Sequence, residues 1–137
     1  MGASVPMIRW LRSRVFPSVR ASTVQRRRML LTDALEVIGQ RYGEPDLSLG
    51  TVAHEIATSR RQLQRAFAEM GGTSFSRELQ RVRMQRAAEL LLDGPAAVQA
   101  VAGAVGYRQP AQFAKVFRRH HGTAPSAFRR SAGRLAA

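Results

Sequence analysis

The chain has no cysteine, and only one of its 22 basic residues, Lys115, is a lysine. The absence of cysteine excludes disulfides, zinc–thiolate sites and cysteine nucleophiles. No run of roughly 18 apolar residues occurs, so no segment is predicted to span a membrane. Aromatic residues make up only 7% of the chain, and few rings are therefore available to stack on the bases of single-stranded nucleic acid.

Acidic residues are also scarce. Nine carboxylates against 22 cations give the 137-residue chain a formal charge of +13. Residues 1–30 and 96–137 contain no acid, and five of the nine acids fall in residues 31–58. One face or end should therefore be strongly positive, as in proteins that bind polyanions. Arginine suits phosphates and base edges, although an arginine-rich genome would also replace lysine in this way.

No pattern typical of a catalytic site is present. The histidines are His54 and the adjacent pair His120 and His121, and neighbouring residues on a helix do not share a face. We expect His120 to be partly packed and His121 to be a cation at a helix end. No glycine-rich phosphate loop precedes a lysine. We therefore predict that the protein is not an enzyme and uses no cofactor and no metal.

The spacing of apolar residues predicts an all-α fold of about seven helices. Glycines, prolines and polar caps set the expected helix limits at about 29–42, 50–57, 59–70, 75–92, 97–105, 110–120 and from about 125 onward. Residues 1–28 are predicted to be a flexible basic tail, and residues 132–137 a frayed one. Arginines interrupt the apolar segment near Trp10, which excludes a secretory signal and leaves a membrane-surface helix as the alternative. A true start at Met29 is equally compatible with the sequence.

Three of these helices have apolar residues that recur on one side and should face a core. In the segment 29–42 they are Leu31, Ala34, Leu35, Ile38 and Tyr42. In the segment 59–70 they are Leu63, Ala66, Phe67 and Met70. In the segment 75–92 they form a wide arc, suited to packing on two sides, of Leu79, Val82, Met84, Ala87, Ala88, Leu91 and Leu92.

A weak internal repeat organises the helices into pairs. Val52-Ala53-x-x-Ile56 matches Val101-Ala102-x-x-Val105 at an offset of 49, and Leu63-x-Arg65-x-Phe67 matches Phe113-x-Lys115-x-Phe117 at an offset of 50. Gly72-Thr73 matches Gly122-Thr123 at the same offset. The repeat predicts two helix-turn-helix units, at about 50–72 and 97–121, joined by the long central helix at about 75–92.

The helix at 59–70 has the features of a recognition helix. Ser59 and Gln62 fit a capping box at its start. Its apolar stripe leaves Arg61, Gln64 and Arg65 pointing the other way, and these side chains can bond to guanine and adenine edges in a major groove. The alternative is an ordinary amphipathic helix with a solvated polar face.

The stretch from Gly106-Tyr107 through Phe113-Ala-Lys-Val-Phe117-Arg-Arg to Gly122-Thr-Ala-Pro125-Ser-Ala-Phe128-Arg is similar to a known helix-turn-helix signature. Together with Ser59-Arg60 through Phe67, and Arg83-Met84-x-x-Ala87-x-x-Leu90-Leu91, it resembles the DNA-binding domain of the AraC/XylS family of bacterial transcription regulators. The resemblance covers about residues 30–130, and places the DNA-binding domain at 29–131.

This resemblance implies a sequence-specific regulator that binds double-stranded DNA in the bacterial cytoplasm, as an activator that contacts RNA polymerase. The helices 59–70 and 110–120 would enter successive major grooves about 34 Å apart. Most family members carry a separate sensor domain, for which this chain has no room. It therefore resembles the short, domain-only members, and no small-molecule effector is implied. A sequence-neutral architectural nucleic-acid-binding protein is the alternative.

The predicted DNA-contacting residues lie on the two recognition helices and at their starts: Arg60, Arg61, Gln64, Arg65, Arg108, Gln109, Gln112, Lys115, Arg118 and Arg119. The second helix departs from the family pattern, because Arg108 stands where a small polar cap is usual. Pro110, Ala111 and Ala114 also occupy positions where polar base contacts are expected. We therefore expect the helix at 59–70 to read most of the sequence and the helix at 110–120 mainly to anchor the protein.

Overall fold

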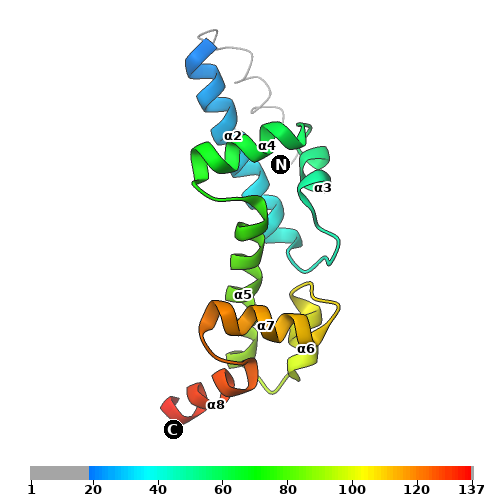
Figure 1. The fold of residues 1–137 in the computed structure, drawn as a ribbon, viewed down its shortest axis with the longest axis vertical. Coiled ribbons are helices and arrows are strands. Elements are labelled where there is room, and N and C mark those ends of the chain that lie inside the picture. Colours follow the sequence, from blue (N-terminus) through cyan, green and yellow to red (C-terminus); the bar gives the residue numbers. More distant parts are fainter. Residues whose placement is uncertain (1–18, 137) are drawn as a thin grey trace, which may run out of the picture. The chain divides into compact units, whose positions relative to one another are not determined.

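The structure is a computed structural model that describes residues 19–136, and its described elements are all helical (Figure 1). They are α2 (Val19–Arg41), α3 (Leu49–Glu55), α4 (Arg60–Ala66), α5 (Phe75–Asp93), α6 (Val98–Ala104), α7 (Pro110–His121) and α8 (Pro125–Ala136). The winding of α4 continues into a π-helical turn, η1, over Phe67–Gly71. The prediction of an all-α fold with about seven helices is confirmed.

The chain divides into two compact units. The first unit contains the described part of Met1–Glu36 together with Leu49–Phe75, and the second contains Val37–Ser48 and Ser76–Ala137. Each unit includes one of the predicted helix-turn-helix pairs, α3 with α4 and α6 with α7. None of the helices in the described range is long and apolar enough to cross a membrane.

In the first unit, a tight turn carries the chain from α3 into α4. Ser59 caps α4, and its hydroxyl accepts a hydrogen bond from the Gln62 amide at 3.1 Å, which confirms the serine half of the predicted capping box. The predicted stripe is buried at Leu63, Ala66 and Phe67, and Met70 is half-buried. The Phe67 ring meets Phe75 edge-on at 6.0 Å between centroids, which packs the start of η1 against the start of α5.

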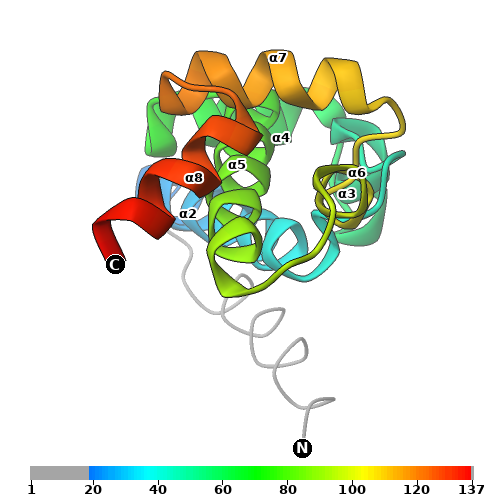
Figure 2. The ribbon, with the colours of Figure 1, turned by 90° about the horizontal axis from the view of Figure 1, so that it is seen from below.

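In the second unit, α6, α7 and α8 surround the C-terminal half of α5 (Figure 2). The core takes side chains from three helices: Met84, Ala87 and Leu91 of α5, Val101 and Ala102 of α6, Phe113 and Phe117 of α7, together with Val105. From α8, the Phe128 ring packs edge-on against Phe117 at 5.3 Å. Fully buried aromatic rings of this kind dominate the stability of a small core.

Helix α2 differs from its prediction in start and in inward face. It begins at Val19 and not near Met29, so residues 19–28 are helical. Leu30, Ala34, Val37 and Ile38 are buried, whereas Leu35 is 39% exposed and Leu31 only half-buried. Ala34 and Ile38 are buried as predicted, but Leu30 and Val37 complete the inward face in place of Leu31 and Leu35. The remainder of the predicted flexible tail, residues 1–18, lies outside the described residues.

Two other helix ends also differ from expectation. The chain was expected to fray from residue 132, but α8 continues to Ala136. Leu92 was expected on the inward arc of α5, but it is 55% exposed and Leu91 is buried. Leu92 lies one residue before the end of α5, and at this end of the helix only the Leu91 side of the predicted arc faces the core.

Of the two adjacent histidines, His121 and not His120 is the one that packs against the core. His120 is exposed and His121 is half-buried. The His121 ring lies 4.4 Å from Phe117 and 5.5 Å from Phe128 between centroids, and its Nε2 is 3.0 Å from the Met84 carbonyl oxygen. Helix α7 continues one residue further than expected, to His121, so this residue falls four positions after Phe117 on the same face.

Candidate nucleic-acid interface

The polar face of α4 is exposed above its buried stripe. Leu63, Ala66 and Phe67 point inward, so successive turns of 100° carry Arg61, Gln64 and Arg65 to the outside, where all three are exposed. Arginine and glutamine can each make two hydrogen bonds to the edge of a base. The predicted outward direction of these three residues is confirmed.

Helix α7 presents an equivalent face. Phe113 and Phe117 are fully buried, and Ala111, Gln112, Lys115, Arg118 and Arg119 are exposed. Ala114, which we expected to point outward, is half-buried. The exposed face of α7 is therefore mainly cationic, with one amide near its start. Phosphates are the partners that such a face meets most readily.

All ten residues predicted to contact DNA are exposed: Arg60, Arg61, Gln64, Arg65, Arg108, Gln109, Gln112, Lys115, Arg118 and Arg119. They belong to α4, to α7 or to the two residues just before α7. The Arg60 side chain lies against the start of α3, and a Cβ added to Gly50 would be 2.9 Å from its Nε. Gly50 thus leaves room for this arginine to lie flat beside the turn.

Helix α7 begins at Pro110 as predicted, but its cap differs from expectation. Gln109, not Arg108, is the N-cap, and its side chain makes no capping hydrogen bond. Pro110 takes the first helical position, where its missing N–H removes one donor that would need a cap and its fixed φ suits a helix. Proline at this position therefore replaces the small polar cap, and Arg108 stands in the turn before the helix.

Arg108 is held by an acid from a distant part of the sequence. Its Nη2 is 2.8 Å from Oδ2 of Asp46, and the two side chains are 65% and 80% exposed. Hydrogen bonding to Arg108 lowers the pKa of Asp46, and the same bond raises the pKa of Arg108. Sixty-two residues separate the partners, so no local pattern could predict this pair.

Several arginines hold the second unit together and do not simply add charge to a surface. Arg83 of α5 donates from Nε to the Tyr42 carbonyl and from Nη2 to the Glu44 carbonyl, each at 2.8 Å. Burial lowers the pKa of Arg83, and its guanidinium lies 5.5 Å from the Tyr107 ring centre. Arg129 of α8 likewise donates to the carbonyls of Leu91 and Ala96, at 3.0 and 2.5 Å.

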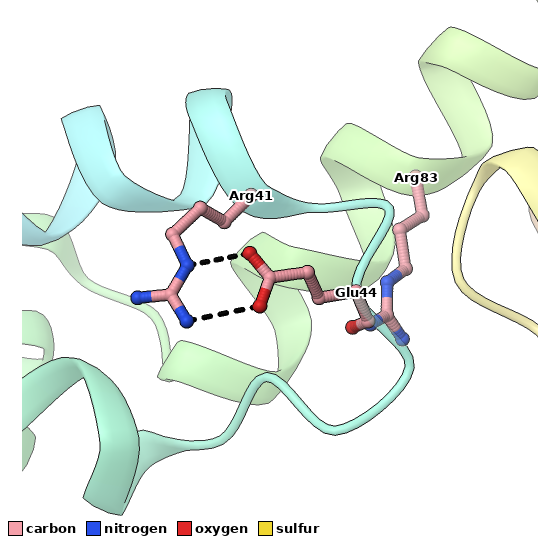
Figure 3. A network of polar contacts seen from close by, with 3 residues as sticks. All are labelled: Arg41, Glu44 and Arg83. Carbon is pink, nitrogen blue, oxygen red and sulfur yellow. Dashed lines mark hydrogen bonds and ion pairs between the residues drawn. The ribbon is translucent and has the colours of Figure 1, made fainter.

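The net charge alone does not predict which arginines bind carbonyls and carboxylates of their own unit. The Arg41 guanidinium binds both carboxylate oxygens of Glu44, and Arg83 reaches the same loop from α5 (Figure 3). In the first unit, Arg27 of α2 pairs with Glu69 of η1. The close approach of Gly43 to the Ala104 carbonyl, 2.7 Å from an added Cβ, shows how tightly this loop is packed. Among the described residues, no three His, Asp or Glu side chains are grouped to hold a metal ion.

Comparison with known proteins assigns this architecture to a family. A family model described as a helix-turn-helix domain matches residues 52–131. An uncharacterized HTH-type transcriptional regulator of Haemophilus influenzae is 42% identical over 78 residues, which is 56% of this chain and 26% of the relative. The aligned chain thus spans about a quarter of that relative's length.

Solved structures agree with the family match. A transcriptional regulator from Chromobacterium violaceum, with an AraC-type DNA-binding domain, has a TM-score of 0.70 at 29% identity, over 75% of this chain and 91% of that one. The DNA-binding domain of AdpA, solved with a target DNA, has a TM-score of 0.69 at 29% identity, over 74% and 90%. The family model covers more than half of the chain, and both solved structures share the fold of this chain. The chain therefore belongs to the AraC family of helix-turn-helix transcription regulators.

Proposed function

We propose that the protein binds double-stranded DNA by placing α4 and α7 in successive major grooves of a specific site. One observation carries this proposal: in both units an exposed polar face lies directly over a fully buried aromatic, Phe67 where α4 continues into η1 and Phe117 in α7. A helix fixed from behind in this way presents its outer side chains in a constant direction. Base readout needs that constancy, because hydrogen bonds to base edges depend on geometry.

The two helices have unequal roles in this proposal. Arg61, Gln64 and Arg65 of α4 bond to base edges. On α7 the exposed face offers Lys115, Arg118 and Arg119 for phosphates, with Gln112 near its start. Ala111 can contact only a thymine methyl group. Helix α4 therefore reads most of the sequence, and α7 anchors the protein and fixes its register on the duplex.

Selection from a randomised duplex library tests this assignment. Arg65→Ala should cost about 1–3 kcal/mol on the best site and relax the preference at one or two base pairs. Arg118→Ala should weaken all sites alike and leave the selected motif unchanged. Arg134→Ala, at an exposed position near the end of α8, removes the same charge outside both helices and is the control. If Arg118→Ala changes the motif while Arg65→Ala does not, the roles are reversed.

Sequence-neutral architectural binding is the second candidate, and the charge of +13 favours it independently of any helix. Competition of the selected site with random duplex separates the two. A specific regulator should prefer its site by at least about 10³-fold, whereas an architectural protein should be displaced equally by both duplexes.

We further propose that the protein activates transcription in the bacterial cytoplasm by contacting RNA polymerase beside its site. The resemblance of its three linked motifs to activators of this family supports this reading. Transcription in vitro from a promoter that carries the selected site should rise when the protein is added to purified polymerase. A fall in transcript would identify a repressor.

A further inference from the structure

The loop between α2 and α3 belongs to the second unit and is fixed within it at several points. Arg83 holds the carbonyls of Tyr42 and Glu44, and the Leu47 amide donates to the Glu44 carbonyl at 3.2 Å. The Leu47 side chain is buried at 7% exposure. Pro45, with its restricted φ, lies in the sequence between Glu44 and Leu47. These contacts therefore fix the backbone of the residue between Pro45 and Leu47.

That residue is Asp46, and its carboxylate pairs with Arg108 at 2.8 Å. Arg108 precedes the N-cap of α7 by one residue, so the pair stands at the start of the helix to which we assign an anchoring role. Residues 96–137 contain no acid of their own. The carboxylate at this end of α7 thus comes from the loop, and it accepts a hydrogen bond from Nη2 of Arg108.

We propose that Asp46 competes with DNA phosphate for Arg108, so that the loop after α2 lowers the affinity of the second unit for every duplex. Carboxylate and phosphate oxygens accept the same guanidinium hydrogen bonds, and a carboxylate 2.8 Å from Nη2 also repels an approaching phosphate. The pair is largely exposed, so it is weak enough to exchange in solution. DNA binding therefore replaces Asp46 by a phosphate. This inference rests on the proposed function.

A double-mutant cycle on the full chain tests the competition, with affinity for the selected duplex and for a random duplex as the readout. Asp46→Asn should tighten binding to both duplexes by about two- to fivefold, the range expected for an exposed ion pair. Asp93→Asn, at the exposed end of α5, makes the same charge change elsewhere and should tighten binding less. In the Arg108→Gln background, Asp46→Asn should gain no more than Asp93→Asn does.

The outcomes are distinguishable. If Asp46→Asn gains equally with and without Arg108, the effect is net charge alone and the proposal is wrong. If Asp46→Asn weakens binding, Asp46 orients Arg108 for DNA, and the competition is again refuted. Thermal melting of each variant checks the fold, which changes at exposed side chains should preserve. Failure of the wild-type chain to prefer its selected duplex would instead contradict the proposed function.

Discussion

Ala57 and Gly106 occupy the same position in the two helix-turn-helix turns, and both have left-handed backbones, with φ of 59° and 92°. In each turn the next residue's amide donates to a carbonyl five residues back, Thr58 to Ala53 and Tyr107 to Ala102, at 2.9 Å in both cases. The recognition helices also end alike, at Gly72 and Gly122, with φ of 63° and 81°. The repeat in the sequence is therefore a repeat of backbone geometry.

Replacing Ala57 by glycine should stabilise the first unit. A left-handed backbone costs a residue with a Cβ about 1–2 kcal/mol. Glycine avoids this cost, but its larger loss of chain entropy on folding offsets about 0.5–1 kcal/mol of the gain. We expect Ala57→Gly to raise the free energy of unfolding by about 0.5–1 kcal/mol, measured by urea denaturation. Ala100→Gly, at an exposed position inside α6, should do the opposite by about 1 kcal/mol. Equal losses in both variants would contradict strain at Ala57.

The reciprocal change, Gly106→Ala, should be costly. An added Cβ would lie 2.8 Å from both the Arg83 Nη2 and the Tyr42 carbonyl oxygen, at a φ of 92°. Both neighbours belong to the same hydrogen bond network, so neither can move freely. We expect a loss of about 2–3 kcal/mol, from strain and from disruption of the Arg83 contacts. Denaturant unfolding should show it, and Gly103→Ala, with open space around it, should not be destabilising.

Local patterns predicted the parts of this fold that depend on short spacings. The buried faces of α4 and α7 follow from apolar residues three and four apart, and the cap of α4 from Ser59 and its neighbours. What the sequence did not reveal depends on long-range packing. Leu30 and Leu31 are equally apolar, so only the packed unit selects between them. Arg83 and Arg129 look like surface cations in the sequence, but bind carbonyls 33 to 41 residues away.

In the candidate interface, too, short spacings predict some features and long-range contacts decide the others. The outward direction of Arg61, Gln64 and Arg65 follows from the helical period. The state of Arg108 does not, because Asp46 reaches it from another element. The start of α7 at Pro110 was predicted correctly, but Arg108 was assigned as the cap in place of Gln109. Proline at the first helical position was the local signal for the correct assignment.

Truncating Phe67 or Phe117 to alanine should destabilise the unit to which it belongs. Phe67 and Phe117 are 1% and 0% exposed, and removal of a fully buried phenylalanine side chain costs about 3–5 kcal/mol. Phe117→Ala should be the more disruptive, because its ring contacts Phe113, His121 and Phe128. Leu92→Ala is the matched control, since Leu92 is 55% exposed. Thermal unfolding unchanged by Phe117→Ala would contradict the packing of α7.

Stability should fall as the solution is acidified through the histidine range. Most of the His120 ring is exposed, but partial desolvation lowers its pKa, and the charges of His121 and Arg81 lower it further. The unfolded chain therefore binds this proton more readily than the folded chain. The contribution of His120 to stability is fully present above the ordinary histidine pKa of about 6.5, and it is lost as pH falls through the lower pKa of the folded state. The melting temperature should drop from about pH 7.5 to about pH 5.5, and His120→Gln should reduce that drop. An unchanged drop in the variant would assign the effect to other groups.

DNA binding should weaken steeply with salt, because arginines that neutralise phosphates release the counterions of the duplex. With roughly 6–10 phosphate contacts, the slope of log affinity against log salt should be near −5 to −9. Not every arginine can contribute. Arg118 of α7 is exposed on the proposed anchoring face, so Arg118→Ala should make the slope shallower by roughly one. Arg41 is already bound by both oxygens of Glu44, so Arg41→Gln should leave the slope unchanged. A wild-type slope shallower than about −2 would rule out a phosphate-dominated interface.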